Sequence, residues 1–81
     1  MITVYSKDNC PWCDRAVAFL EEKNELYNVV KIGQDITREE FLEQFPNART
    51  VPFIKIGSVE IPGYEALVEY INHPVRMKPL T

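Results

Sequence analysis

The stretch that decides the fold is ITVYSKDNCPWCDRAVAFLEE, at residues 2–22. It begins with a β-rich segment at residues 2–5, in which more apolar and less apolar side chains alternate. A polar turn then leads to Pro11, which suits the first turn of a helix because its missing N–H is not needed there. Apolar residues recur beyond it at helical spacing, and we expect the helix to end near Asn24. A strand therefore passes into a helix at Cys10.

The middle of the chain predicts a second strand and a short helix. Residues 27–32 form a β-rich run, and a loop follows it. Thr37 and Glu40 then fit a capping box, in which each side chain hydrogen-bonds to the backbone N–H of the other residue. The helix that they open should end at about Phe45, before a proline. Three side chains are expected on its buried face: Phe41, Leu42 and Phe45.

The last third of the chain predicts a hairpin and a final helix. Two β-rich runs at residues 53–56 and 59–61 flank Gly57-Ser58, which is a signal for a type II′ turn. Gly63 opens the final helix, and Pro74 should end it.

The predicted order is β-α-β-α-β-β-α, an α/β chain with a four-stranded mixed sheet flanked by helices. Its 81 residues fit one domain, which we expect over residues 1–72, with a short tail at residues 73–81. The first β-α-β unit should be parallel and right-handed. Ligands of such open sheets bind beyond the carboxyl ends of the strands, and the first strand ends just before Cys10.

Charge and hydropathy exclude several classes of function. Nine Lys and Arg residues against twelve Asp and Glu give a net charge of -3 without a basic run, so we expect no nucleic-acid partner. No apolar stretch approaches the ~20 residues that span a bilayer, so no membrane partner is expected. The first residues lack the features of a signal peptide, which predicts a cytoplasmic protein. A lasting structural disulfide is uncommon in that compartment.

The two cysteines, Cys10 and Cys13, indicate a chemical role and not a disulfide that stabilises the fold. A bridge across two intervening residues closes a very short loop, so it removes little entropy from the unfolded chain. The helix start offers free N–H groups and a partial positive charge, which should hold the pKa of Cys10 below the ~8.5 of a free thiol. Cys13 lies deeper in the helix. We therefore expect Cys10 to be the nucleophile and Cys13 the resolving thiol.

Two cysteines at this spacing are also half of a zinc site, so other roles stay open. A zinc site needs two more ligands, and the chain offers only His73 as a further one of the usual kind. A metal site shared between two chains, an iron–sulfur cluster with external thiols, and an inert buried pair are the remaining alternatives. The strand–helix junction favours redox chemistry over all of them, and we expect no metal.

Three motifs, which follow the N-terminal strand in order, make the chain resemble a glutaredoxin of the thioredoxin-like superfamily. They are Cys-Pro-Trp-Cys at residues 10–13, Thr-Val-Pro at residues 50–52 and Ile-Pro-Gly-Tyr-Glu at residues 61–65. The chain departs from the family at two points. Trp12 stands where tyrosine is usual, and Pro62 replaces the first of two usual glycines.

The resemblance implies a thioredoxin-like fold and a site for glutathione. In the family the proline of the second motif is cis and faces the cysteines, so Pro52 should leave the backbone of Val51 free to pair with an extended peptide. Lys7 and Arg49 are then candidates for the glycine carboxylate of glutathione, because carboxylates need cations.

The start of the last helix, at residues 63–65, can hold the γ-glutamyl carboxylate through backbone amides, and Glu65 can hold the ammonium group. Trp12 can form an apolar wall. Nine residues are thus implied to bind glutathione: Lys7, Trp12, Arg49, Thr50, Val51, Pro52, Gly63, Tyr64 and Glu65.

The function implied is that of a glutathione-dependent thiol–disulfide oxidoreductase. It would reduce protein disulfides and glutathione mixed disulfides, with glutathione as co-substrate and no permanently bound cofactor. Ribonucleotide reductase, a common glutaredoxin partner, is a candidate protein target, and the chain is expected to be a monomer. Two alternatives remain: a glutaredoxin-like protein recharged by thioredoxin reductase, and a non-catalytic iron–sulfur carrier. The proline after Cys10 disfavours the carrier, because clusters are commoner in family members without it.

Overall fold

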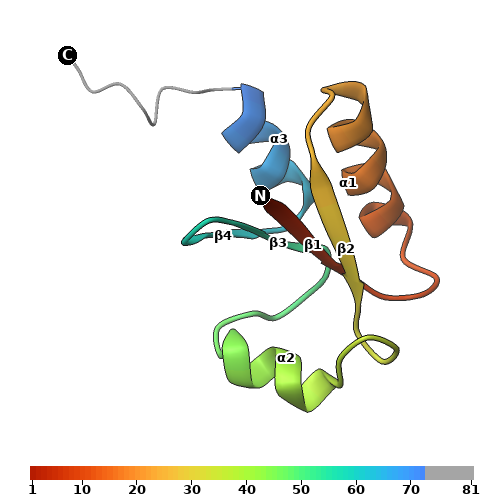
Figure 1. Ribbon diagram of the computed structural model, residues 1–81, viewed down its shortest axis with the longest axis vertical. Helices are drawn as coiled ribbons and strands as arrows, with labels where there is room; N and C mark the ends of the chain where they lie inside the picture. The colour runs from red at the N-terminus through yellow and green to blue at the C-terminus, as the bar shows by residue number, and fades with distance from the viewer. Residues whose placement is uncertain (73–81) are drawn as a thin grey trace.

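The structure, a computed structural model, describes residues 1–72 (Figure 1). The predicted tail at residues 73–81 lies outside the described residues, and so does His73. The predicted order of strands and helices is confirmed. The elements are β1 (Ile2–Ser6), α1 (Pro11–Glu22), β2 (Tyr27–Lys31), α2 (Arg38–Gln44), β3 (Phe53–Ile56), β4 (Val59–Pro62) and α3 (Tyr64–Asn72).

The four strands form one mixed sheet in the order β2-β1-β3-β4. β1 pairs in parallel with β2, and both the β1–β3 and β3–β4 pairs are antiparallel. β2 ends at Lys31, one residue before the predicted boundary at Ile32. The chain turns there because the Lys31 carbonyl accepts hydrogen bonds from the backbone N–H groups of Gln34 and Asp35.

The main core lies between the sheet and the pair α1 and α3, which pack against each other (Figure 1). β1 contributes Ile2 and Val4 to this core because alternate side chains of a strand share one face. Further members come from the neighbouring strands and both helices: Ala16, Phe19, Leu20, Ile54, Ile61 and Leu67. This packing fixes the first turn of α1 close to the carboxyl end of β1.

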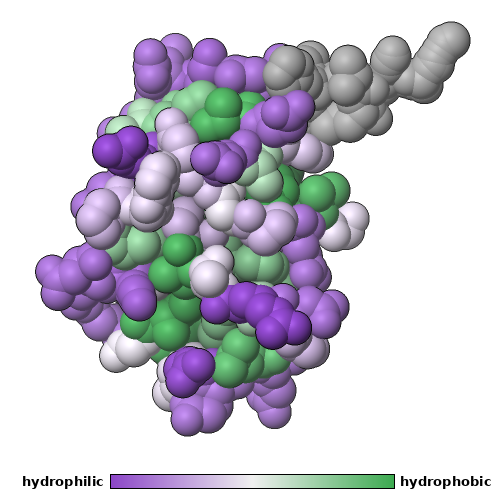
Figure 2. Space-filling model, turned by 180° about the vertical axis from the view of Figure 1, so that it is seen from behind, coloured by the Kyte–Doolittle hydropathy of each residue, from purple (hydrophilic) through white to green (hydrophobic). Residues whose placement is uncertain are grey.

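A second, aromatic cluster lies where α2 meets the carboxyl end of β1. Phe41, Phe45 and Phe53 are buried there, and their rings contact one another and the ring of Tyr5. The prediction that Leu42 shares this buried face is wrong, because Leu42 is 37% exposed. Figure 2 shows hydrophobic surface in the lower half of the rear face, where α2 lies, with strongly hydrophilic side chains at its border.

The β3–β4 hairpin and the start of α3 follow the predicted turn chemistry. Gly57 has a φ of 60° and Ser58 is not among the residues of positive φ, which fits the type II′ turn. Pro62 ends β4, an edge strand, where a missing backbone N–H is tolerated. Gly63 has a φ of 103°, and its carbonyl accepts the first hydrogen bond of α3 from the N–H of Leu67.

Candidate redox site

Cys10 is the N-cap of α1. Its backbone is extended, with φ −123° and ψ 93°, and its carbonyl accepts a hydrogen bond from the N–H of Asp14. Its sulfur accepts a second hydrogen bond, from the backbone N–H of Cys13 at 3.2 Å. Pro11 follows at the first helical position, as predicted. The sulfur therefore satisfies one of the free N–H groups of the helix start.

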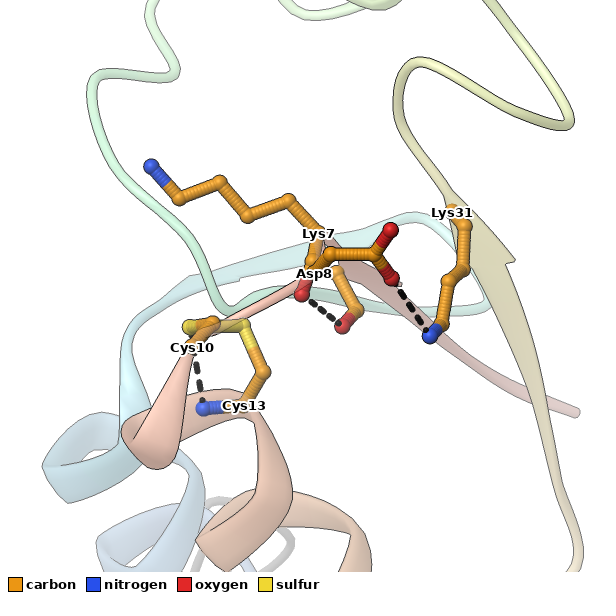
Figure 3. Close-up of a disulfide and its surroundings, with 6 residues drawn as sticks. Lys7, Asp8, Cys10, Cys13 and Lys31 are labelled. Carbon is orange, nitrogen blue, oxygen red and sulfur yellow. Dashed lines mark hydrogen bonds and ion pairs between the residues drawn. A yellow bond between two sulfur atoms is a disulfide. The ribbon is translucent and has the colours of Figure 1, made fainter.

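Cys10 and Cys13 form a disulfide in this structure, with Cα atoms 5.2 Å apart (Figure 3). Cys10 is 8% exposed and Cys13 is 1% exposed, so an incoming sulfur can reach only Cys10 without movement of the helix. After reduction, the helix start and the Cys13 N–H would both favour a thiolate on Cys10, and we expect its pKa to fall below that of a free thiol.

The loop before Cys10 sends two charged side chains in opposite directions. Figure 3 shows the Lys7 side chain extending away from Asp8, which faces Lys31 on β2. The Asp8 carboxylate accepts hydrogen bonds from Lys31 Nζ at 3.0 Å and from Gln34 Nε2 at 2.8 Å. Asn9, which has a φ of 58°, completes the turn into the helix. The loop is thus tied to β2 on one side, while the Lys7 side chain extends on the other.

The Asp8–Lys31 ion pair shifts the pKa of both groups. The hydrogen bond from Lys31, with its positive charge, lowers the pKa of Asp8. The same contact raises the pKa of Lys31. Both side chains are well exposed, so the pair orients the loop more than it stabilises the fold.

A first hollow lies between the cysteine motif and the start of α3, with a cavity volume of about 240 Å³. The Val51–Pro52 peptide bond at its wall is cis, as the resemblance implies. Its lining residues are Trp12, Val51, Pro52, Pro62, Gly63, Tyr64 and Glu65.

Trp12 is half exposed and forms one wall of the first hollow. The guanidinium of Arg15 lies over its ring, 4.8 Å from the centroid, and the ring of Tyr64 lies 5.7 Å away. A cation over an aromatic face is attracted by the ring, so Arg15 helps to orient Trp12. Trp12 lies between the two cysteines in sequence, and its exposure places it in the site and not in the core.

A second hollow lies on the other side of Val51, with a cavity volume of about 410 Å³. Lys7, Arg38 and Arg49 contribute positive charge to it, and apolar side chains form much of the remaining wall. Its lining residues are Lys7, Ile32, Arg38, Phe41, Leu42, Ala48, Arg49, Thr50 and Val51.

The structure brings all nine residues expected to bind glutathione to these two hollows. Val51 lines both of them, so they adjoin. Sequence reasoning did not include Arg38 or Pro62 in the site. Pro62 lies inside the third motif and could have been included for that reason, whereas Arg38 belongs to no motif. A signal for Arg38 does exist, because a cation in the first turn of a helix opposes the helix dipole.

The described residues also bear on metal and membrane roles. Within residues 1–72, no three His, Cys, Asp or Glu side chains gather closely enough to hold a metal ion. No helix in that part of the chain is long and apolar enough to cross a membrane.

Comparison with known sequences identifies relatives along most of the chain. The sequence model of the glutaredoxin family matches residues 2–61. Glutaredoxin 1 of Rickettsia felis is 34% identical over 71 residues, which cover 84% of this chain and 69% of that protein. Glutaredoxin-1 of monkeypox virus is 34% identical over 77 residues, which cover 88% of this chain and 71% of that protein.

Solved structures show the same fold. The buckwheat glutaredoxin–glutathione complex is similar with a TM-score of 0.73 and 25% identity, over 90% of this chain and 69% of that one. Reduced Escherichia coli glutaredoxin matches with a TM-score of 0.74 and 23% identity, over 93% and 96% of the two chains. These matches confirm the thioredoxin-like fold. The chain belongs to the glutaredoxin family, and its Cys10–Cys13 pair is the redox-active disulfide of a thiol–disulfide oxidoreductase.

Proposed function

We propose that this chain reduces disulfides with glutathione as its co-substrate. One observation carries the proposal: nine residues implied by family resemblance, from three separate segments, line two hollows that adjoin at Val51. A glutaredoxin from buckwheat that is similar to this chain forms a complex with glutathione, which adds support.

In the proposed complex, glutathione lies extended across Val51 with its sulfur directed to Cys10. Backbone amides at the start of α3 would hold the γ-glutamyl carboxylate, since a helix N-terminus favours anions. Glu65 would pair with the ammonium group. Lys7 and Arg49 would face the glycine carboxylate from the second hollow. Opposite charges would thus meet at both ends of the tripeptide.

With a glutathionylated protein, only Cys10 is required. Its thiolate attacks the glutathione sulfur, the Cys10–glutathione disulfide forms, and the protein thiolate leaves. A second glutathione thiolate then attacks the glutathione sulfur on Cys10. Glutathione disulfide departs, and the Cys10 thiolate is restored. One free glutathione is consumed for each protein thiol released, because the other half of the glutathione disulfide comes from the substrate.

With a protein disulfide, both cysteines take part. Cys10 attacks one sulfur and releases the other as a thiolate, which leaves a mixed disulfide between enzyme and substrate. The thiolate of Cys13 then attacks the Cys10 sulfur and releases the second substrate thiol. The product is the Cys10–Cys13 disulfide, the state of this structure. Two glutathiones return it to the dithiol.

A coupled assay that follows NADPH oxidation tests the reductant. A small disulfide serves as substrate, with glutathione and glutathione reductase in one arm and thioredoxin reductase alone in the other. We expect turnover in the glutathione arm. Turnover confined to the thioredoxin reductase arm would contradict the proposal and favour the alternative redoxin.

We also propose a cellular compartment for this reaction. The cytosol, where glutathione is kept reduced, is the compartment in which this cycle would run.

Ribonucleotide reductase is the candidate protein acceptor, and its turnover with NADPH, glutathione, glutathione reductase and this protein is the corresponding assay. We expect a monomer, which sedimentation analysis of the full chain can test.

A further inference from the structure

The second hollow offers more than glutathione needs. The glycine carboxylate of glutathione is one anion, and Lys7 and Arg49 already provide two cations for it. Arg38 adds a third cation, and Ile32, Phe41 and Leu42 add an apolar wall. Among residues 1–72, none of those that line the hollow is acidic.

The three cations of this hollow are without ion-pair partners in the described part of the chain. Within residues 1–72 the structure records a single side-chain salt bridge, between Lys31 and Asp8, and it involves none of the three. The whole chain carries a net charge of -3, so this concentration of positive charge is local. Such a patch attracts an anionic partner and orients it.

Two of the lining residues are poorly explained by folding. Arg38 occupies the first helical position of α2, where its charge opposes the helix dipole, while Glu39 and Glu40 next to it favour the dipole. Leu42 is 37% exposed although Phe41 beside it is buried. Both Arg38 and Leu42 line the hollow, so a bound partner would account for each of them.

We propose that the second hollow docks the segment that flanks the disulfide of a protein substrate, and that this segment carries an apolar side chain followed by carboxylates. The apolar side chain would contact Leu42 and Ile32, and the carboxylates would pair with Arg38 and its neighbours. Because Val51 lines both hollows, a substrate chain that reaches Cys10 along Val51 continues directly into this one.

This inference rests on the proposed reduction of protein disulfides and is independent of glutathione as the reductant. In the reaction concerned, the reduced enzyme passes two electrons to the substrate disulfide. The Cys10–Cys13 disulfide forms, and the substrate leaves as a dithiol. This half-reaction needs only the enzyme and the substrate, so it can be measured without glutathione.

The test compares two peptides that share the same internal disulfide. One carries Leu-Glu-Glu at both ends and the other carries Leu-Lys-Lys. The prereduced protein is mixed with excess peptide in a stopped-flow instrument, and the fluorescence of Trp12, the single tryptophan, follows oxidation. We expect the acidic peptide to react at least about tenfold faster at low salt, and we expect the ratio of the two rates to fall as salt is added.

Arg38→Glu is compared with Lys23→Glu as a matched control. Both variants change the net charge equally, but Lys23 caps the far end of α1, about 20 Å along the helix from Cys10. We expect the ratio of the rates to fall about fivefold or more in Arg38→Glu and to stay unchanged in Lys23→Glu. Should the glutamate variant fold poorly by circular dichroism, Arg38→Gln replaces it, with a smaller fall expected.

Three results would overturn the proposal. Equal rates for the two peptides would show that the hollow does not select acidic segments. An equal fall of the ratio in both variants would assign the preference to net charge. A uniform slowing of both peptides by Arg38→Glu would give Arg38 a structural role only. These three results can be interpreted even if the glutathione arm of the coupled assay fails. That assay tests how the oxidised enzyme is reduced, whereas the peptide experiment measures how the reduced enzyme is oxidised by its substrate.

Discussion

Cys10 serves as both the cap of a helix and the reactive sulfur. The Cys13 N–H that stabilises the cap is the donor that would stabilise a thiolate at the same atom. The fold therefore needs a hydrogen-bond acceptor at this position, and the chemistry needs that acceptor to be sulfur. Serine supplies an acceptor without a redox sulfur, and alanine supplies neither, so the two roles can be separated.

Substitution of Cys10 by serine or alanine should separate stability from activity. Serine is a good N-cap, so Cys10→Ser should fold nearly as stably as the reduced wild type. Cys10→Ala should lose about 1 kcal/mol in the free energy of unfolding, measured in urea under reducing conditions. Equal stabilities of the two variants would show that the cap contributes nothing.

Serine variants of the two cysteines should lose activity on different sets of substrates. Cys13→Ser should still remove glutathione from a glutathionylated peptide, because that route uses Cys10 alone. It should lose catalysed reduction of a protein disulfide, while Cys10→Ser should lose both activities by several orders of magnitude. Assays with both substrates check this, and retained activity in Cys10→Ser would refute the assignment of the nucleophile.

Asp8 gives a pH-dependent signal at the edge of the site. Its pKa lies below the ordinary value of 3.8 because of Lys31, so its contribution to stability is present above that value and is lost as the pH falls through the native pKa. Titration of the Asp8 carboxyl carbon by NMR should show this lowered pKa. Lys31→Met should return it towards 3.8. A titration unchanged by Lys31→Met would show that the ion pair does not form in solution.

At the scale of elements, the junction of β4 and α3 explains how the chain tolerates a departure from its family. Pro62 ends an edge strand, where the missing N–H disturbs no central pairing. Gly63 keeps the positive φ that leads into α3. The retained glycine is therefore the one whose conformation the turn requires, and the replaced one is not.

Gly63→Ala and Pro62→Ala form a matched pair for this junction. A Cβ at Gly63 would meet no heavy atom within 4 Å, so the cost of alanine there is conformational, about 1–2 kcal/mol in the free energy of unfolding. Pro62→Ala, at an exposed position, should change it by only about 0.5 kcal/mol. Urea denaturation measures both. A larger loss for Pro62→Ala than for Gly63→Ala would contradict this account.

The elements that could be predicted are those with strong local signals. The Thr37–Glu40 capping box is present, and Asn24 has the positive φ of a residue that ends a helix. Leu42 was assigned to the wrong face because a seven-residue helix gives too few positions to separate buried Phe41 from its neighbour. The predicted strand runs one residue too far, to Ile32, because isoleucine favours strands. The observed end at Lys31 depends on backbone hydrogen bonds of the turn that follows.

At the scale of the whole molecule, the site is made from segments distant in sequence. The motif at residues 50–52 could be assigned by resemblance, since it belongs to a recurrent pattern. Arg38 could not, because its place beside Lys7 and Arg49 depends on how the aromatic cluster under α2 packs against β1. Local patterns predict elements and motifs, while the shape of the second hollow depends on long-range packing.

The redox-active disulfide should stabilise the whole molecule only modestly. A bridge with a sequence separation of 3 closes a loop whose entropy is worth about 2 kcal/mol at most. The two packed clusters remain when it is reduced, so the dithiol form should stay folded. Urea unfolding of oxidised and reduced protein gives the difference, and an unfolded reduced chain at 25 °C would contradict this expectation.

The hydrogen bond from Cys13 to Cys10 also couples folding to electron transfer. A thiol whose pKa is lower in the fold stabilises the reduced native chain as the pH rises from that native pKa towards ~8.5, by about 1.4 kcal/mol per pKa unit. The oxidised chain gains nothing over the same range. Since the folded and unfolded forms of both redox states make a closed thermodynamic cycle, each such unit raises the reduction potential of the native pair by about 30 mV over that of the unfolded pair. A helix cap thereby sets how strongly the folded protein oxidises its partners.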